Sequence, residues 1–150
     1  MIFPLSLHES ITFTKTITAE EVAAFAQITG NSSPTHTDEA LMRHTDFGGL
    51  LVPGELLLGL AATSAFQLAE RATPQKGAEL PVSLGFERVR FIRPVCFGET
   101  VTVQYTIDDI EYARNRSWAK VEIFNEKAEL VCFGAHLMKW LPMDAAKEDN

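Results

Sequence analysis

Positive charge is scarce in this chain, which carries 13 Lys and Arg residues against 20 Asp and Glu among its 150 residues. The formal net charge is −7. A protein that binds nucleic acid through the phosphate backbone needs clustered Lys and Arg in excess, so we expect no nucleic-acid partner. The acidity does not exclude a small anionic ligand, because a few local cations can hold one.

Cysteine and long apolar runs are also scarce. The two cysteines, Cys96 and Cys132, lack the spacing of metal or redox pairs, which favours reduced thiols in a cytoplasmic protein. The longest apolar run, Leu56 to Ala65, is too short to span a bilayer, and the first residues lack the basic segment of a signal peptide. We therefore expect neither export nor a membrane partner.

The remaining composition is typical of one globular domain. Apolar residues make up 46% of the chain, and a chain of this length buries roughly 68–70% of its unfolded surface. The sequence contains no internal repeat. We assign residues 1–143 to a single domain and residues 144–150 to a flexible C-terminal tail.

Two helices can be placed from local signals. Thr18 and Glu21 form a capping box ahead of a helix that ends at Gly30. Thr37 opens a shorter helix that ends near His44. The first of these helices is expected to bury four side chains, those of Val22, Phe25, Ala26 and Ile28.

The segment 55–71 predicts a third helix and says most about the fold. Its first three turns are Leu, Gly and Ala on nearly every side, whereas a surface helix shows one apolar stripe. We therefore expect this helix to be almost wholly buried. A linker is expected at 73–77, and strand patterns cover residues 10–17, 80–93, 100–112, 117–125 and 130–141.

One enclosed helix, with a strand before it and four strands after it, predicts an α+β domain of the hotdog fold. In this fold a curved antiparallel sheet of five strands wraps around the central helix, and we expect the last four strands to form a meander. The alternative is a helix that lies on a flat sheet. A flat sheet covers only one helix face, so the hotdog fold is the better prediction.

The sequence Gly-Asn-Ser-Ser-Pro-Thr-His at residues 30–36 resembles the Gly-Asp-x-Asn-Pro-hydrophobe-His pattern of the MaoC-like, type 2 (R)-specific enoyl-CoA hydratase family. Asn31 stands at the position of the family's catalytic Asp, and Ser33 at that of its Asn. Further blocks at 47–54 and 89–100 extend the resemblance over most of the chain. Three residues match the first pattern, namely Gly30, Pro34 and His36.

The resemblance implies hydration of a trans-2-enoyl thioester, or the reverse dehydration. In the family, the Asp and His share a water that adds to the double bond, and a backbone N–H at the start of the hotdog helix stabilises the enolate oxygen. By position, His36 is the proton-transfer residue and Gly54 supplies the N–H. Asn31 cannot accept a proton, so its expected role is to position a water or the thioester. Coenzyme A enters only as part of the substrate, and no other cofactor is implied.

Further candidate residues surround these three. Glu55 follows Gly54 at the helix N-terminus, where the dipole favours a carboxylate, and it either turns into the cleft as the missing base or faces solvent. The gap between His36 and His44 is not a usual ligand spacing, so we expect no metal. The residues expected to contact the substrate are Ser33, Phe47, Leu51 and Val52.

Three functions remain open at this point. The first is an acyl-CoA hydratase or dehydratase that uses His36. The second is a non-catalytic acyl-CoA-binding subunit, and the third is an acyl-CoA thioesterase that uses Glu55 or a water held by Asn31 and His36. A histidine after a proline can also simply cap the following helix. Unpaired sheet edges and the resemblance together imply a homodimer or larger homo-oligomer, with the cleft near the interface.

Overall fold

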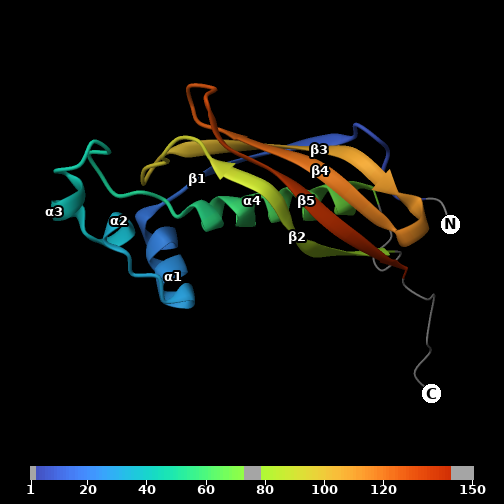
Figure 1. Cartoon of the computed structure of the whole chain (residues 1–150), viewed down its shortest axis with the longest axis horizontal. Coiled ribbons are helices and arrows are strands. Elements are labelled where there is room, and N and C mark those ends of the chain that lie inside the picture. Colours follow the sequence, from blue (N-terminus) through green and yellow to red (C-terminus); the bar gives the residue numbers. More distant parts are fainter. Residues whose placement is uncertain (1–2, 73–78, 143–150) are drawn as a thin grey trace, which may run out of the picture.

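The computed structural model describes residues 3–72 and 79–142 (Figure 1). The expected linker at 73–77 and the expected tail at 144–150 lie outside the described residues. No helix within the described part is long and apolar enough to cross a membrane. The elements in chain order are β1 (Ser10–Thr16), α1 (Ala19–Thr29), α2 (Pro34–Thr37), α3 (Glu39–Met42), α4 (Gly54–Ala72), β2 (Glu79–Phe91), β3 (Thr100–Glu111), a 3₁₀ turn (Tyr112–Arg114), β4 (Arg116–Phe124) and β5 (Leu130–Pro142).

The five strands form one antiparallel sheet in the order β1-β3-β4-β5-β2. Each expected strand overlaps an observed one. The expected meander of four strands is wrong in one respect, because β2 pairs with β5 at the far side of the sheet and not with β3. The chain after β2 must therefore cross the end of the sheet to reach β3. Residues 92–95 of this crossing line the cavity described below.

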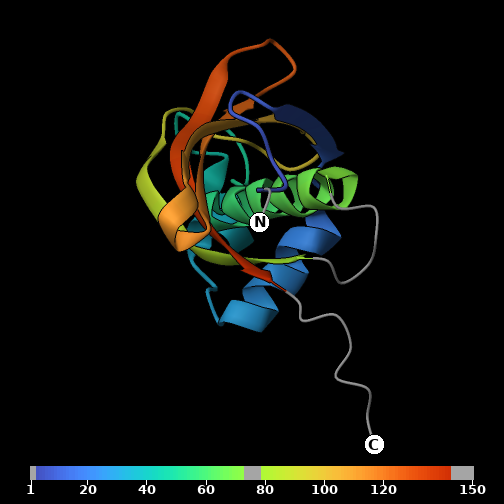
Figure 2. The same ribbon diagram turned by 90° about the vertical axis from the view of Figure 1, so that its right-hand side faces the viewer.

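The sheet curves around α4, as Figure 2 shows, and the core lies between them. The expectation that α4 is almost wholly buried is only partly right. Its surface away from the sheet is open, and there Gly59 is exposed and Phe66 is 55% exposed. The reason is that five strands curve around the helix without closing on its far side. The α4 residues buried against the sheet are Leu57, Leu60, Ala61, Ser64, Ala65, Leu68 and Ala69.

The three shorter helices gather at the end of α4 that begins with Gly54 (Figure 1). The capping box of α1 is confirmed, because Thr18 Oγ1 accepts the Glu21 N–H at 3.3 Å and Glu21 Oε2 accepts the Thr18 N–H at 3.0 Å. The burial expected for Ile28 is wrong, since this side chain is 84% exposed. The helix expected at 37–44 is shorter than predicted, because only α3 at 39–42 forms there and Asp38 caps it, while a separate one-turn helix, α2, precedes it at 34–37.

One polar network reaches from the buried side chains of Tyr105 on β3 and His136 on β5 to the exposed Ser83 on β2. The imidazole of His136 is fully buried, stacks on the ring of Phe86 at a centroid distance of 4.1 Å and lies 3.0 Å from the Tyr105 hydroxyl through Nδ1. Its Nε2 lies 2.8 Å from Ser83 Oγ. A buried hydroxyl must donate its proton, so Tyr105 donates to Nδ1 and Nε2 donates to Ser83. Both nitrogens of the neutral ring are thus satisfied.

Candidate active site

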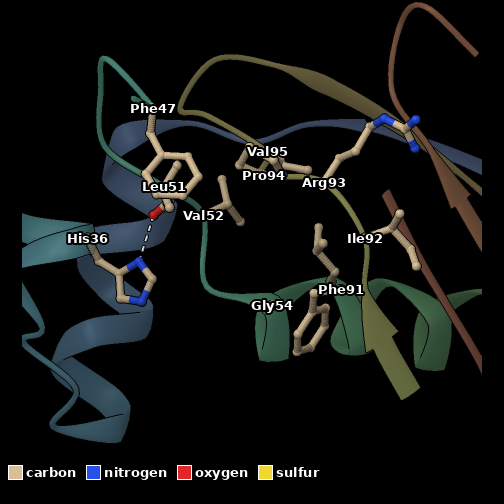
Figure 3. Close-up of a pocket in the computed structure, with 11 residues that line it drawn as sticks. His36, Phe47, Leu51, Val52, Gly54, Phe91, Ile92, Arg93, Pro94 and Val95 are labelled. Carbon is tan, nitrogen blue, oxygen red and sulfur yellow. Dashed lines mark hydrogen bonds between the residues drawn. The ribbon is translucent and has the colours of Figure 1, made fainter. Parts of the chain in front are cut away.

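A cavity of about 400 Å³ opens where the segment after α3 meets the start of α4 and the end of β2 (Figure 3). Its lining is mainly apolar and includes one imidazole and one guanidinium group. A concave apolar site with few polar groups is typical of small-molecule binding sites. The lining residues are His36, Phe47, Leu51, Val52, Gly54, Leu57, Phe91, Ile92, Arg93, Pro94 and Val95.

The one-turn helix α2 and the segment before α4 hold His36 in place. Pro34 is the first residue of α2, where the missing N–H costs no hydrogen bond. The backbone of Leu51 is bonded to this turn twice. Its N–H donates to the Thr35 carbonyl at 2.9 Å, and its carbonyl lies 2.7 Å from Nδ1 of His36 (Figure 3).

The bond to Leu51 decides which nitrogen of His36 carries the proton. A backbone carbonyl can only accept a hydrogen bond, so Nδ1 donates and carries the hydrogen. In the neutral ring, Nε2 is then an unprotonated acceptor. No hydrogen bond joins Nε2 to any of the lining residues drawn in Figure 3. The cavity therefore contains a nitrogen that can take a proton.

Gly54 brings the start of α4 into the same cavity. The first N–H groups of a helix have no partner within the helix, and they lie at the positive end of its dipole. The backbone of Gly54 is outside the left-handed region, so conformation does not explain the glycine. Space does, because a Cβ added there would lie 2.4 Å from Cζ of Phe91. Figure 3 shows the ring of Phe91 against the start of the helix.

The structure brings together some of the residues expected at the site. Phe47, Leu51 and Val52 line the cavity with His36 and Gly54. His36 comes from α2, before α3, and the other four come from residues 47–54, after α3. Their meeting therefore depends on the bonds between Leu51 and α2. No three His, Cys, Asp or Glu side chains gather as metal ligands would within the described ranges.

Asn31 and Ser33 lie outside the lining of the cavity. Asn31 is exposed, and its Oδ1 accepts the backbone N–H of Ser33 at 3.2 Å. The Ser33 hydroxyl in turn lies 2.9 Å from that of Thr35. The Asn31 side-chain oxygen and the Ser33 hydroxyl are therefore both bonded within the turn that leads into α2.

Glu55 lies on the other side of α4. Its side chain is exposed and lines a second groove of about 320 Å³ between α1, β1 and α4. That groove also contains the ion pair between Lys15 and Glu21, whose charged atoms are 2.5 Å apart. Among the residues that line the cavity of His36, in the part of the chain described, there is no carboxylate.

The sequence did not point to the wall formed by the end of β2 and the crossing that follows. Phe91, Ile92, Pro94 and Val95 line the cavity, as does Arg93. The block at 89–100 indicated only a strand and a turn, since nothing local shows that the crossing passes over the start of α4. Arg93 is held at the rim by a carboxylate of Glu129 at 3.3 Å and by the carbonyl of Leu130 at 2.9 Å.

Comparison with known proteins identifies the family. Residues 6–127 match the MaoC-like domain family, and the chain belongs to that family. A 3-hydroxyacyl-thioester dehydratase from Mycobacterium tuberculosis is 31% identical over 96 residues, which are 64% of this chain and 61% of the relative. The match thus spans less than two thirds of that relative's length.

Solved structures of similar proteins share the fold. An (R)-hydratase from A. caviae superimposes with a TM-score of 0.76 at 28% identity, over 92% of this chain and 98% of that structure. An R-hydratase from Pseudomonas aeruginosa has a TM-score of 0.72 at 24% identity, over 97% and 91% of the two chains, and supports the fold alone. The protein is thus a hotdog-fold member of a family of hydratases and dehydratases.

Proposed function

We propose that this protein adds water to the double bond of an enoyl-CoA thioester, and removes it in the reverse direction, with His36 as the proton-transfer residue. The observation that carries the proposal is the fixed tautomer of His36 in a cavity that also contains the start of α4. The addition needs a base for the water and a donor for the developing oxyanion. Nε2 of His36 and the N–H of Gly54 are groups of these two kinds.

The reaction can be written with these two groups. The thioester carbonyl oxygen accepts a hydrogen bond from the Gly54 N–H, and Nε2 of His36 takes a proton from a water whose oxygen adds to the β-carbon. Electrons of the double bond move onto the carbonyl oxygen as an enolate, which the helix N-terminus stabilises. The protonated His36 then gives its proton to the α-carbon. The net change is the addition of H and OH, and His36 returns to its neutral form.

Asn31 acts in this proposal as a positioning residue. Its side-chain oxygen holds the Ser33 N–H, and the Thr37 hydroxyl donates to the Ser33 carbonyl at 3.0 Å. These bonds shape the turn that presents His36. The neutral amide itself transfers no proton.

A second function, an acyl-CoA-binding subunit without catalysis, is favoured by one observation. No carboxylate is among the described residues that line the cavity, so water activation depends on His36 alone. A single general base contributes roughly 10²–10⁴-fold to a rate. The measurement below therefore has to distinguish slow turnover from none.

The test is incubation with crotonyl-CoA while the loss of enoyl absorbance and the release of free thiol are both followed. Hydration lowers the absorbance without thiol, hydrolysis releases thiol, and a binding subunit does neither. We expect hydration, with His36→Ala lowering kcat/KM by roughly 10²–10⁴-fold. His44→Ala is the matched control, because His44 is exposed and outside the cavity. Equal kcat/KM in His36→Ala and wild type would contradict the proposal.

Two further variants test whether a carboxylate can act as a second base, one by adding a carboxylate at position 31 and one by removing the carboxylate of Glu55. Asn31→Asp keeps the oxygen that holds the Ser33 N–H and adds a charge. A rate above that of wild type would assign the second proton acceptor to this position. We expect Glu55→Gln to leave hydration unchanged, because Glu55 lines the other groove. A loss in Glu55→Gln as large as that in His36→Ala would make Glu55 the base instead.

We also propose that two copies of this chain pair through β2. This strand pairs with β5 on one side, and no described strand pairs with its other edge. An unpaired edge with exposed apolar side chains is a surface on which a second strand can add. The exposed apolar residues on this strand include Leu80, Val82 and Leu84.

A further inference from the structure

Phe91 forms a wall of the cavity to which the proposed chemistry gives no role. It is the last residue of β2, and its side chain is 50% exposed. The ring tip points at Gly54, since a Cβ built there would lie 2.4, 2.5 and 2.6 Å from Cζ, Cε2 and Cε1. Real Cβ atoms do not approach other atoms so closely. The ring therefore occupies the space into which a Cβ on the first residue of α4 would project.

The position of this ring determines which thioesters fit beside Gly54. This step rests on the proposed function. If the Gly54 N–H holds the thioester oxygen, the carbonyl carbon and the α-carbon lie beside Gly54. The ring of Phe91 lies beside the same residue and lines the same cavity (Figure 3). A substituent on the α-carbon would have to share this space with the ring. Close-packed neighbours do not give way to an added methyl group without cost.

We propose that Phe91 is a specificity-determining residue, which restricts the site to thioesters that carry no substituent on the α-carbon. The ring acts through its volume and takes no part in proton transfer. In apolar pockets one methyl or methylene group changes kcat/KM by roughly 10–200-fold. We expect discrimination of that size between crotonyl-CoA and its 2-methyl analogue, and its loss when the ring is removed.

The contact itself can be tested without any activity. In the wild-type background, Gly54→Ala places a Cβ against the ring and should lower the urea midpoint of unfolding. In the Phe91→Ala background the three atoms nearest to that Cβ are gone, and alanine is the better helix former, so the midpoint should rise. Equal shifts in the two backgrounds would show that the ring does not rest on Gly54 and would overturn the inference.

The specificity is tested by kcat/KM for crotonyl-CoA and for 2-methylcrotonyl-CoA. We expect Phe91→Ala, and more weakly Phe91→Leu, to reduce the preference for crotonyl-CoA at least tenfold. Phe66→Ala is the matched control, because Phe66 is an exposed phenylalanine on α4 outside the cavity. An unchanged preference in both Phe91 variants, with the contact to Gly54 confirmed, would overturn the role of the ring.

Binding measurements separate this inference from the proposed function. Calorimetry with the saturated thioesters butyryl-CoA and 2-methylbutyryl-CoA reports the same restriction without turnover. If the wild type prefers butyryl-CoA at least tenfold and Phe91→Ala does not, the restriction holds even for a protein that hydrates nothing. If neither protein discriminates between the two ligands, the restriction is wrong whatever the hydration assay shows.

Discussion

Acid is expected to destabilise this protein through His136. Burial disfavours the charged imidazole and lowers the pKa of His136 to about 4, whereas a histidine in an unfolded chain has a pKa of about 6.5. Between these values the unfolded chain binds a proton that the folded protein does not. The free energy of unfolding therefore falls as the pH falls from about 6.5 to about 4, and it is unaffected above this window. The difference between the two pKa values corresponds to roughly 3 kcal/mol.

The assay is urea unfolding at a series of pH values, for wild type and for His136→Gln. Glutamine does not titrate, while other groups such as Glu21 titrate in both proteins, so the difference between the two curves isolates His136. We expect wild type to lose roughly 3 kcal/mol more than the variant between about pH 7 and about pH 4. The protein should be dilute, because its isoelectric point of about 5.0 lies within the pH range of the assay and favours aggregation there. Its concentration should be constant, because any dimer makes the stability depend on concentration.

Parallel curves for the two proteins would refute this account of His136. Since His136→Gln also alters the bonds to Tyr105 and Ser83, a second measurement on wild type is needed. The carbon and proton resonances of the His136 ring should titrate near pH 4. Titration near the ordinary pKa of about 6.5 would mean that the ring is accessible to water and that its burial does not control its charge.

Two further predictions concern the core and the sheet edge. We expect Leu68→Ala, at a fully buried position on α4, to lower the free energy of unfolding by about 2–5 kcal/mol in urea titrations. Phe66→Ala on the exposed face should cost much less, and equal losses would contradict the observed orientation of the helix. Light scattering at micromolar concentration should show a dimer, and Val82→Lys should shift it toward monomer, because a charge disfavours pairing at a strand edge. A monomeric wild type would count against pairing through β2.

Local signals predicted most of the elements but not how distant strands pair. The capping box at Thr18 and Glu21 and the missing polar stripe on α4 are features of neighbouring residues, and both led to the observed helices. The pairing of β2 with β5 is different. Alternation of apolar and polar residues shows that a segment is a strand but carries no information about its partner. The exposure of Ile28 was missed because the periodicity of α1 does not show how little of the fold covers that helix.

The sequence also predicted those parts of the candidate site that belong to local motifs, but not the contacts between distant segments. His36 and Gly54 belong to sequence blocks that resemble a known family, and the structure places both on one cavity. Phe91 was not predictable as a neighbour of Gly54, because their contact depends on the path of the chain from β2 to β3. Asn31 is the opposite case, because the sequence pattern suggested a place at the site and the structure puts the residue outside the cavity lining. Its place in the pattern suggested a group facing the substrate, but the short turn also needs an acceptor for a backbone N–H, and the Asn31 oxygen serves there.

The carbonyl of Leu51 has a consequence for how this site can be altered. The atom that fixes the proton on His36 belongs to the main chain, so every amino acid at position 51 supplies it. Only proline there would remove the companion bond from the Leu51 N–H to Thr35. Leu51 also lines the cavity, so its side chain can be changed while this bond remains. A randomised library can therefore remodel this wall of the cavity while the hydrogen bond that sets the tautomer of His36 is kept.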